Sequence, residues 1–173
     1  YNGNNAYKGQ DKELGYPGLV AIKEMKPDYF IGTGDNVYFD HPAKNYTEWL
    51  KKAGNNPLPG RFGGEEVKDE TGMRKKYHVQ FIQQRFQELF AEVGTYWEKD
   101  DHDYRLNDGD PFTKFPISHE LGIKNFREQL PVVDPKDKNA VTYRTYRMNK
   151  DVQVWMLEGR DYRSSNAMAV GKE

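Results

Sequence analysis

The sequence contains no cysteine, which excludes disulfides, thiolate nucleophiles and cysteine-type zinc sites from this chain. It also has no run of about 18 apolar residues and no basic-then-apolar leader, so neither a membrane span nor a signal peptide is predicted. An excess of one charge is missing too, with 26 Lys plus Arg against 27 Asp plus Glu. Composition therefore gives no signature of nucleic-acid or anionic-membrane binding.

Several common catalytic and binding motifs are also missing. A calcium loop starting at Asp101 would place Arg105 and Leu106 at its fifth and sixth positions, which excludes an EF-hand. Gly32 and Gly34 begin like a dinucleotide-binding loop, but Val37 stands where the third glycine is needed, and no P-loop is present. The sequence has neither the nucleophile elbow of serine hydrolases nor the zinc-binding helix of zincins.

What is present suits one folded domain. The chain has 173 residues, of which 36% are hydrophobic and 14% aromatic, including 12 Tyr, so large half-polar rings are expected to carry much of the packing. It starts without Met, and we expect residues 1–173 to be a single partial domain within a longer protein.

The pattern of apolar residues predicts alternating helices and strands, an α/β organisation. Residues 55–72 are rich in glycine, proline and charge and are expected to form a surface insertion. The remaining predicted elements are a short helix ending near Lys26, a buried strand over 28–33, an amphipathic helix over 73–93, a strand over 95–97, a helix over 118–130 capped by Ser118, and a hairpin pairing 141–147 with 152–157.

Two acidic clusters follow predicted strands, where ligands gather in α/β sheets. The first contains Asp35, Asn36, Tyr38 and Asp40, and the second covers residues 100–103, with the sequence Asp-Asp-His-Asp. Carboxylates with an imidazole suit a divalent or trivalent metal pair, and a tyrosine phenolate is a ligand for iron(III). The same residue types also cap helices and form turns, so both readings stay open at this point.

Three segments in order resemble the alkaline phosphatase D-like metallophosphoesterases. Residues 27–38, PDYFIGTGDNVY, are similar to the GDxxY strand-end motif of that family, and residues 100–103 to its Asp-Asp-His-Asp/Glu motif. Residues 158–164, EGRDYRS, resemble its later Asp-x-Arg-x-Tyr-Arg segment. The resemblance implies a four-layer α/β/β/α sandwich with mixed sheets, only partly present in this chain, and a metal cluster of Fe(III) and Ca(II) at the strand ends.

The resemblance also implies roles for individual residues. Asp35 would bridge the metals, Tyr38 would bind iron, and Asp101 would be a further ligand. His102 would face the substrate phosphate as a charge stabiliser or proton donor, and Arg160 would contact the phosphate.

Asn36 and Asp100 are further candidates for substrate contact. The expected activity is hydrolysis of a phosphate monoester or diester by metal-activated water, with a small-molecule or phospholipid-like substrate. The family suggests a secreted or periplasmic protein.

The sequence departs from the family pattern at several points. Lys99 replaces the usual tryptophan before the acids, and Glu158 stands where the family commonly has Asp. The family's first ligand motif and its late histidine motifs are not in this chain, so we expect the isolated chain to be inactive. Two alternatives remain: a non-catalytic metal- or ligand-binding domain of the same fold, and a glycosidase that pairs Asp35 with Asp101.

Overall fold

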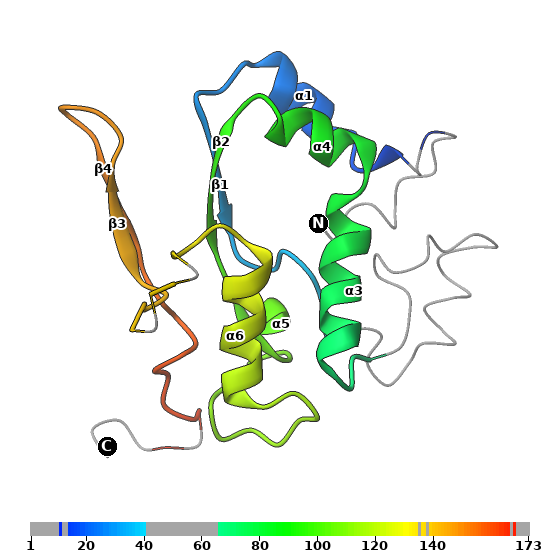
Figure 1. The fold of residues 1–173 in the computed structure, drawn as a ribbon, viewed down its shortest axis with the longest axis vertical. Helices are drawn as coiled ribbons and strands as arrows, with labels where there is room; N and C mark the ends of the chain where they lie inside the picture. The colour runs from blue at the N-terminus through cyan, green and yellow to red at the C-terminus, as the bar shows by residue number, and fades with distance from the viewer. Residues whose placement is uncertain are drawn as a thin grey trace.

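The structure, a computed structural model, describes residues 11, 14–40, 66–134, 136–137, 139–166 and 168. Helices and strands mix in these parts, as the sequence predicts (Figure 1). The elements are α1 (Gly18–Glu24), β1 (Tyr29–Thr33), α3 (Glu70–Phe81), α4 (Gln84–Phe90), β2 (Gly94–Glu98), α5 (Asp101–Tyr104), α6 (His119–Gln129), β3 (Arg144–Arg147) and β4 (Gln153–Met156).

β1 and β2 form a parallel pair in which Tyr29 lies opposite Gly94 and Thr33 opposite Glu98. A parallel pair needs a crossover connection, and α3 and α4 provide its helical part. β3 and β4 form the predicted antiparallel hairpin, with Arg144 opposite Met156. The hairpin lies on one side of the parallel pair and α3 on the other (Figure 1). These two two-stranded sheets do not by themselves make a four-layer sandwich, which stays a prediction.

β1 was expected to be a buried strand, but in the described part of the chain only one of its faces is covered. Gly32 is buried and Phe30 half-buried, whereas Tyr29 and Ile31 are 44% and 40% exposed. The covered face packs against aromatic rings, since Phe30 lies 5.5 Å from Trp97 between ring centroids. Alternate residues of a strand point to opposite faces, so one covered face leaves the other residues exposed.

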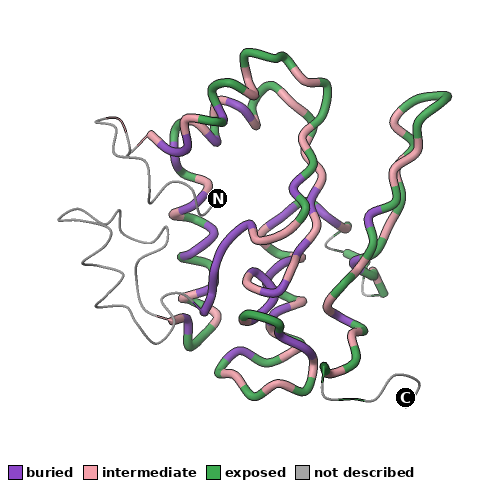
Figure 2. The backbone as a smooth tube through the Cα atoms, turned by 180° about the vertical axis from the view of Figure 1, so that it is seen from behind, coloured by how far each residue is buried: buried purple, intermediate pink, exposed green. Residues whose placement is uncertain are grey.

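The prediction of a single helix over 73–93 is wrong, because the chain bends after Phe81. Gln83 has an extended conformation (φ −63°, ψ 135°), and α4 starts in a new direction at Gln84. The bend allows two separate cores to form from one apolar stripe: Met73 and Tyr77 join one, while Phe86 and Leu89 join the other. Both sets of large side chains are thereby buried. Figure 2 shows buried stretches of backbone alternating with exposed ones along the chain.

The two cores lie on either side of the segment that follows β1. The larger contains Val37, Phe39, Val67, Met73, Tyr77, Trp97, Ile117, Phe126, Leu130 and Val132. The smaller contains Tyr16, Leu19, Tyr38, Phe86 and Leu89. Val37 and Phe39 belong to one core and Tyr38 to the other, so this segment is buried between the two cores. Its polar residues Asn36 and Asp40 are buried with it.

Of the predicted surface insertion, residues 55–65 lie outside the described part of the chain. Its last residues, Glu70–Gly72, form the first turn of α3 instead, because the Asp69 side chain caps this helix by accepting a hydrogen bond from the Gly72 N–H at 2.8 Å. The predicted cap of α6 is confirmed, since Ser118 accepts from the Leu121 N–H at 3.2 Å.

Candidate metal centre

The carboxyl ends of β1 and β2 meet at one edge of the parallel pair, which brings the two acidic segments together. Gly34 allows this approach. A Cβ atom at Gly34 would lie 2.5 Å from the Asp100 Cβ and 2.8 Å from its backbone nitrogen, and Gly34 has a φ of 103°. Only glycine accepts both the contact and the backbone conformation at low cost.

Asp35, Asp101 and His102 each offer a ligand atom, and these atoms all lie within 4.8 Å of one another. Asp35 has a left-handed backbone conformation with φ 52°, which is unusual for a residue with a side chain. Strained conformations of this kind concentrate at functional sites, where the surrounding structure holds them. The cluster therefore joins residues from both predicted motifs.

Tyr38 contacts two members of the cluster. Its hydroxyl donates to Asp35 Oδ2 at 2.8 Å, and its ring stacks on the His102 imidazole with centroids 4.3 Å apart. Burial raises the pKa of the Tyr38 hydroxyl well above its usual value, and the neighbouring Asp35 carboxylate raises it further. Burial also raises the pKa of Asp35, with the like charges of Asp101 and Asp100 adding to this effect against the Tyr38 hydrogen bond.

His102 is oriented by Asp40, a residue of the first acidic cluster. Its Nδ1 lies 2.7 Å from Asp40 Oδ1, and Asp40 Oδ2 accepts from the Asn107 N–H at 2.9 Å. Burial would lower the pKa of His102, but the hydrogen bond and charge of Asp40, together with the charges of Asp101 and Asp35, raise it above the ordinary value. The imidazole is thus favoured as a cation beside the Asp35–Asp101 pair.

Asp103 is fully buried and has a structural part rather than a place in the cluster. Its Oδ2 accepts from the Asn36 N–H at 3.2 Å and from Asn36 Nδ2 at 2.6 Å, and its Oδ1 accepts from the Asp100 N–H at 2.7 Å. Asn36 Nδ2 also donates to the Glu98 carbonyl at 2.8 Å. Burial raises the pKa of Asp103 to about 7. Asn36 and Asp103 therefore tie the two strand ends together beneath the cluster.

Arg160 reaches the cluster from the segment after β4. Its Nε donates to Asp100 Oδ1 at 2.7 Å, and its Nη2 lies 3.8 Å from Asp101 Oδ2. The Arg160 side chain is only 12% exposed. Its Nη1 is buried and has no hydrogen-bond partner among the residues that the structure describes. The three segments that the sequence singled out thus converge on one place.

The donor set fits a hard metal ion. Carboxylates and a phenolic oxygen are the ligands that such ions prefer, and Asp35 Oδ1 is a buried oxygen with no hydrogen-bond partner in the described residues. The raised pKa of Asp35 reports crowding of negative charge, which a cation would relieve.

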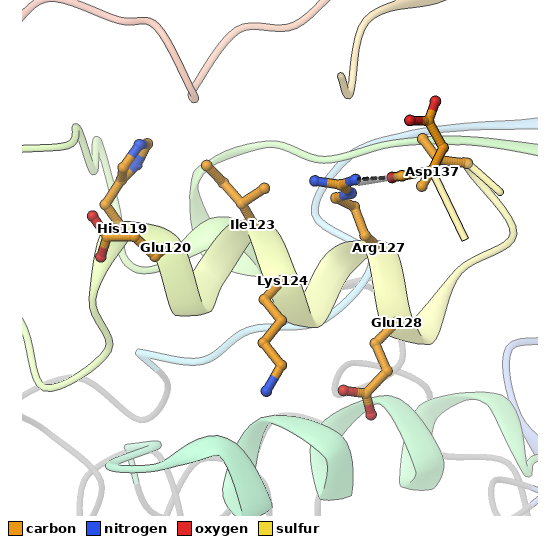
Figure 3. A pocket seen from close by; sticks show the side chains of 8 residues that line it. His119, Glu120, Ile123, Lys124, Arg127, Glu128 and Asp137 are labelled. Atoms are coloured by element: carbon orange, nitrogen blue, oxygen red, sulfur yellow. Dashed lines mark hydrogen bonds between the residues drawn. The ribbon is translucent and has the colours of Figure 1, made fainter. Parts of the chain in front are cut away.

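A groove of about 550 Å³ lies elsewhere, along α6 (Figure 3). His119, Ile123 and Arg127 line it, and the Arg127 guanidinium donates to the Asp137 carbonyl at 3.2 Å. Lys124 also lines the groove, and its side chain extends toward α3, where its ammonium pairs with Glu70 at 2.6 Å. No residue of the acidic cluster lines the groove, so the two features are separate.

The structure brings the predicted site residues together, and it shows supporting contacts that were not predicted from the sequence. Asp40 and Asp103 were seen as acids near the motifs, but their roles in holding His102 and Asn36 were not predicted. A local signal existed for Asp103, because an acid three residues after Asp100 matches a capping pattern. No local signal existed for the partners of Lys99, which come from a distant segment.

Within the described residues, no helix is both long and apolar enough to cross a membrane. Comparison with known proteins gives one match: the family model described as PhoD-like phosphatase matches residues 6–173. No curated protein and no solved structure shows a significant match.

Proposed function

Because the chain belongs to the PhoD-like phosphatase family, we propose that the full-length protein is a metal-dependent phosphoric ester hydrolase. The observation that carries the proposal is the convergence of Asp35, Asp101 and His102, with ligand atoms within 4.8 Å, at the joined ends of β1 and β2. The family supports a phosphatase type of chemistry, and the substrate class is accordingly a phosphate ester.

Each residue has a part in this proposal. Asp35, Tyr38 and Asp101 hold the metal ions, for which Fe(III) and Ca(II) suit the phenolic and carboxylate oxygens. When bound, the ions supply the Lewis acid that polarises a phosphoryl oxygen and acidifies the attacking water. Tyr38 must release its proton to act as a phenolate ligand, and a nearby cation favours that release.

His102 and Arg160 act on the substrate side. The Asp40 contact favours the protonated form of His102, which can stabilise phosphate charge or donate a proton to the leaving oxygen. Arg160 Nη1 has no hydrogen-bond partner among the described residues, and its N–H groups suit a phosphate oxygen. The Asn36 side-chain amide already donates hydrogen bonds to Asp103 and to the Glu98 carbonyl, which favours a supporting role over direct substrate contact.

The test is an assay of the full-length protein on nitrophenyl phosphate monoesters and diesters with iron and calcium, together with analysis of bound metal. Asp35→Ala should abolish turnover and lower metal content. Asp28→Ala is the matched control, because Asp28 is exposed and lies just before the opposite end of the same strand. Turnover that is equal in wild type and Asp35→Ala would refute the proposal.

The glycosidase and non-catalytic alternatives have distinct outcomes in the same assay. Bound metal without turnover of any phosphate ester would favour a binding domain. Metal-independent cleavage of a nitrophenyl glycoside would favour carboxylate catalysis by Asp35 and Asp101. A secreted or periplasmic location is also part of the proposal, and cell fractionation tests it separately.

A further inference from the structure

Lys99 is a deeply buried cation beside the candidate site, although it is neither a predicted ligand nor a substrate contact. Its side chain has 0% exposure, and its Nζ lies 2.5 Å from both Glu158 Oε2 and Asp161 Oδ1. The ammonium also lies over the rings of Tyr104 and Phe126, at 5.6 and 5.5 Å from their centroids. A buried charge is tolerated only when it is paired and hydrogen-bonded, as here.

The partners of Lys99 shape the turn that carries Arg160. Glu158 Oε1 accepts from the Arg160 N–H at 2.6 Å and from the Asp161 N–H at 3.0 Å, while its other oxygen pairs with Lys99. Asp161 is held from the opposite side by the Thr142 hydroxyl. The backbone on both sides of Arg160 is thus fixed by two carboxylates that share one ammonium.

The same turn directs the Arg160 guanidinium at the acidic cluster. Lys99 directly precedes Asp100, whose Oδ1 accepts from Arg160 Nε at 2.7 Å. The residues therefore form a closed loop of contacts: Lys99 to Glu158, Glu158 to the Arg160 backbone, and the Arg160 side chain back to Asp100. A loop of this kind fixes the guanidinium relative to the end of β2, because each contact limits the next.

We propose that Lys99 is a positioning residue, which acts through Glu158 and Asp161 to hold Arg160 ready for a phosphate group. This inference rests on the proposed function, which supplies phosphate as the ligand. It predicts that Lys99 and Arg160 act as one unit in phosphate binding, although Lys99 itself never touches the phosphate.

The experiment is calorimetric titration of the full-length protein with inorganic phosphate, for wild type, Lys99→Met, Arg160→Met and the double variant. Each single change should weaken phosphate binding by about tenfold or more, as expected for loss of a charged hydrogen bond. The double variant should bind no more weakly than Arg160→Met alone. Lys99→Arg, which keeps the charge, should bind phosphate more tightly than Lys99→Met.

Arg85→Met is the control for the loss of a partly buried cation. Arg85 has the same 12% side-chain exposure as Arg160 and ties α4 to Asp11 and Gly15. It should lower stability without changing phosphate affinity. If Lys99→Met does not fold, Glu158→Gln, which keeps the side-chain shape, takes its place in the same cycle.

Three outcomes would overturn the inference: additive effects of Lys99→Met and Arg160→Met, unchanged affinity in Lys99→Met, or no phosphate binding by wild type. Failure of the proposed function gives a different result. In that case wild type turns over no phosphate ester, whatever the pattern of phosphate affinities.

Discussion

His102 Nδ1 lies 2.7 Å from Asp40 Oδ1, and this contact joins two residues that are 62 positions apart in the chain. Asp40 in turn accepts from the Asn107 N–H, so the carboxylate is held on both oxygens. The ring orientation of His102 is therefore fixed through Nδ1.

Asp40→Asn should lower the pKa of His102, because the hydrogen bond and charge of Asp40 raise it against the effect of burial. Titration of the histidine ring by NMR in full-length protein would measure the change. The alkaline limb of the pH–rate profile should move to lower pH in the variant, since the imidazole then loses its proton at a lower pH. An unchanged His102 pKa would show that the carboxylate does not set its protonation.

Gly34→Ala should destabilise the protein by about 2 to 4 kcal/mol, because positive φ and a crowded Cβ both carry a cost. The new Cβ would lie 2.5 Å from the Asp100 Cβ and would force the strand ends apart. Urea unfolding measures the loss. Gly18→Ala is the control, since none of the described residues lies within 4 Å of a Cβ at this first residue of α1. Equal stability of the two variants would contradict the close contact.

Asn36→Ala should cost about 2 to 4 kcal/mol of unfolding free energy, because it removes the buried amide that donates to Asp103 Oδ2 and to the Glu98 carbonyl. Asn149→Ala provides the comparison. The Asn149 side chain likewise makes two hydrogen bonds, accepting from the N–H groups of Asp151 and Val152, but it lies in the exposed hairpin turn. Its loss should cost about 1 kcal/mol or less. Chemical unfolding of both variants decides whether burial makes the difference.

Lys76→Met should stabilise the protein near pH 7. Burial lowers the pKa of Lys76 from 10.5 to about 8, with the Asp40 charge opposing part of the shift. Between these values the unfolded chain holds a proton that the folded protein has released, so the unfolding free energy rises with pH in this window. Below this pH window the folded protein bears the full cost of burying the ammonium. Removing the ammonium should therefore raise the unfolding free energy by about 1 to 3 kcal/mol.

The pH dependence provides the check on Lys76. The stability difference between Lys76→Met and wild type, measured by urea unfolding, should be largest at pH 7 and smaller at pH 10. Lys124→Met serves as the control for the loss of an exposed ammonium. A difference that is constant with pH would mean that Lys76 keeps its ordinary pKa.

The sequence was most informative where local chemistry decides the structure. Ser118 caps α6 as predicted, and the hairpin forms where two β-rich arms flank a turn. The two acidic clusters were predicted to matter because each follows a strand, and the parallel pairing brings Asp35 and Asp101 together. The cap, the hairpin and the place of each acidic cluster after its strand depend on a few neighbouring residues, which is why they could be predicted from the sequence.

Other features depend on packing between distant segments. The spacing of apolar residues could not predict the bend at Gln83, because Phe86 and Phe90 continue the apolar stripe that starts before it. The second core, which contains Leu19, accounts for the break. Lys99 looked like a simple departure from a family pattern. Its partner Glu158 lies 59 residues later, so no local signal could show that the ammonium is buried and paired.

The parallel pairing of β1 with β2 also bears on how the site forms in time. Thr33 and Glu98 face each other across 65 positions of sequence, so the chain must close a long loop before the two acidic segments meet. Contacts of such long range form slowly compared with local helices. Metal capture by Asp35 and Asp101 together should therefore follow sheet formation, and during refolding it would report the moment at which the two strands find each other.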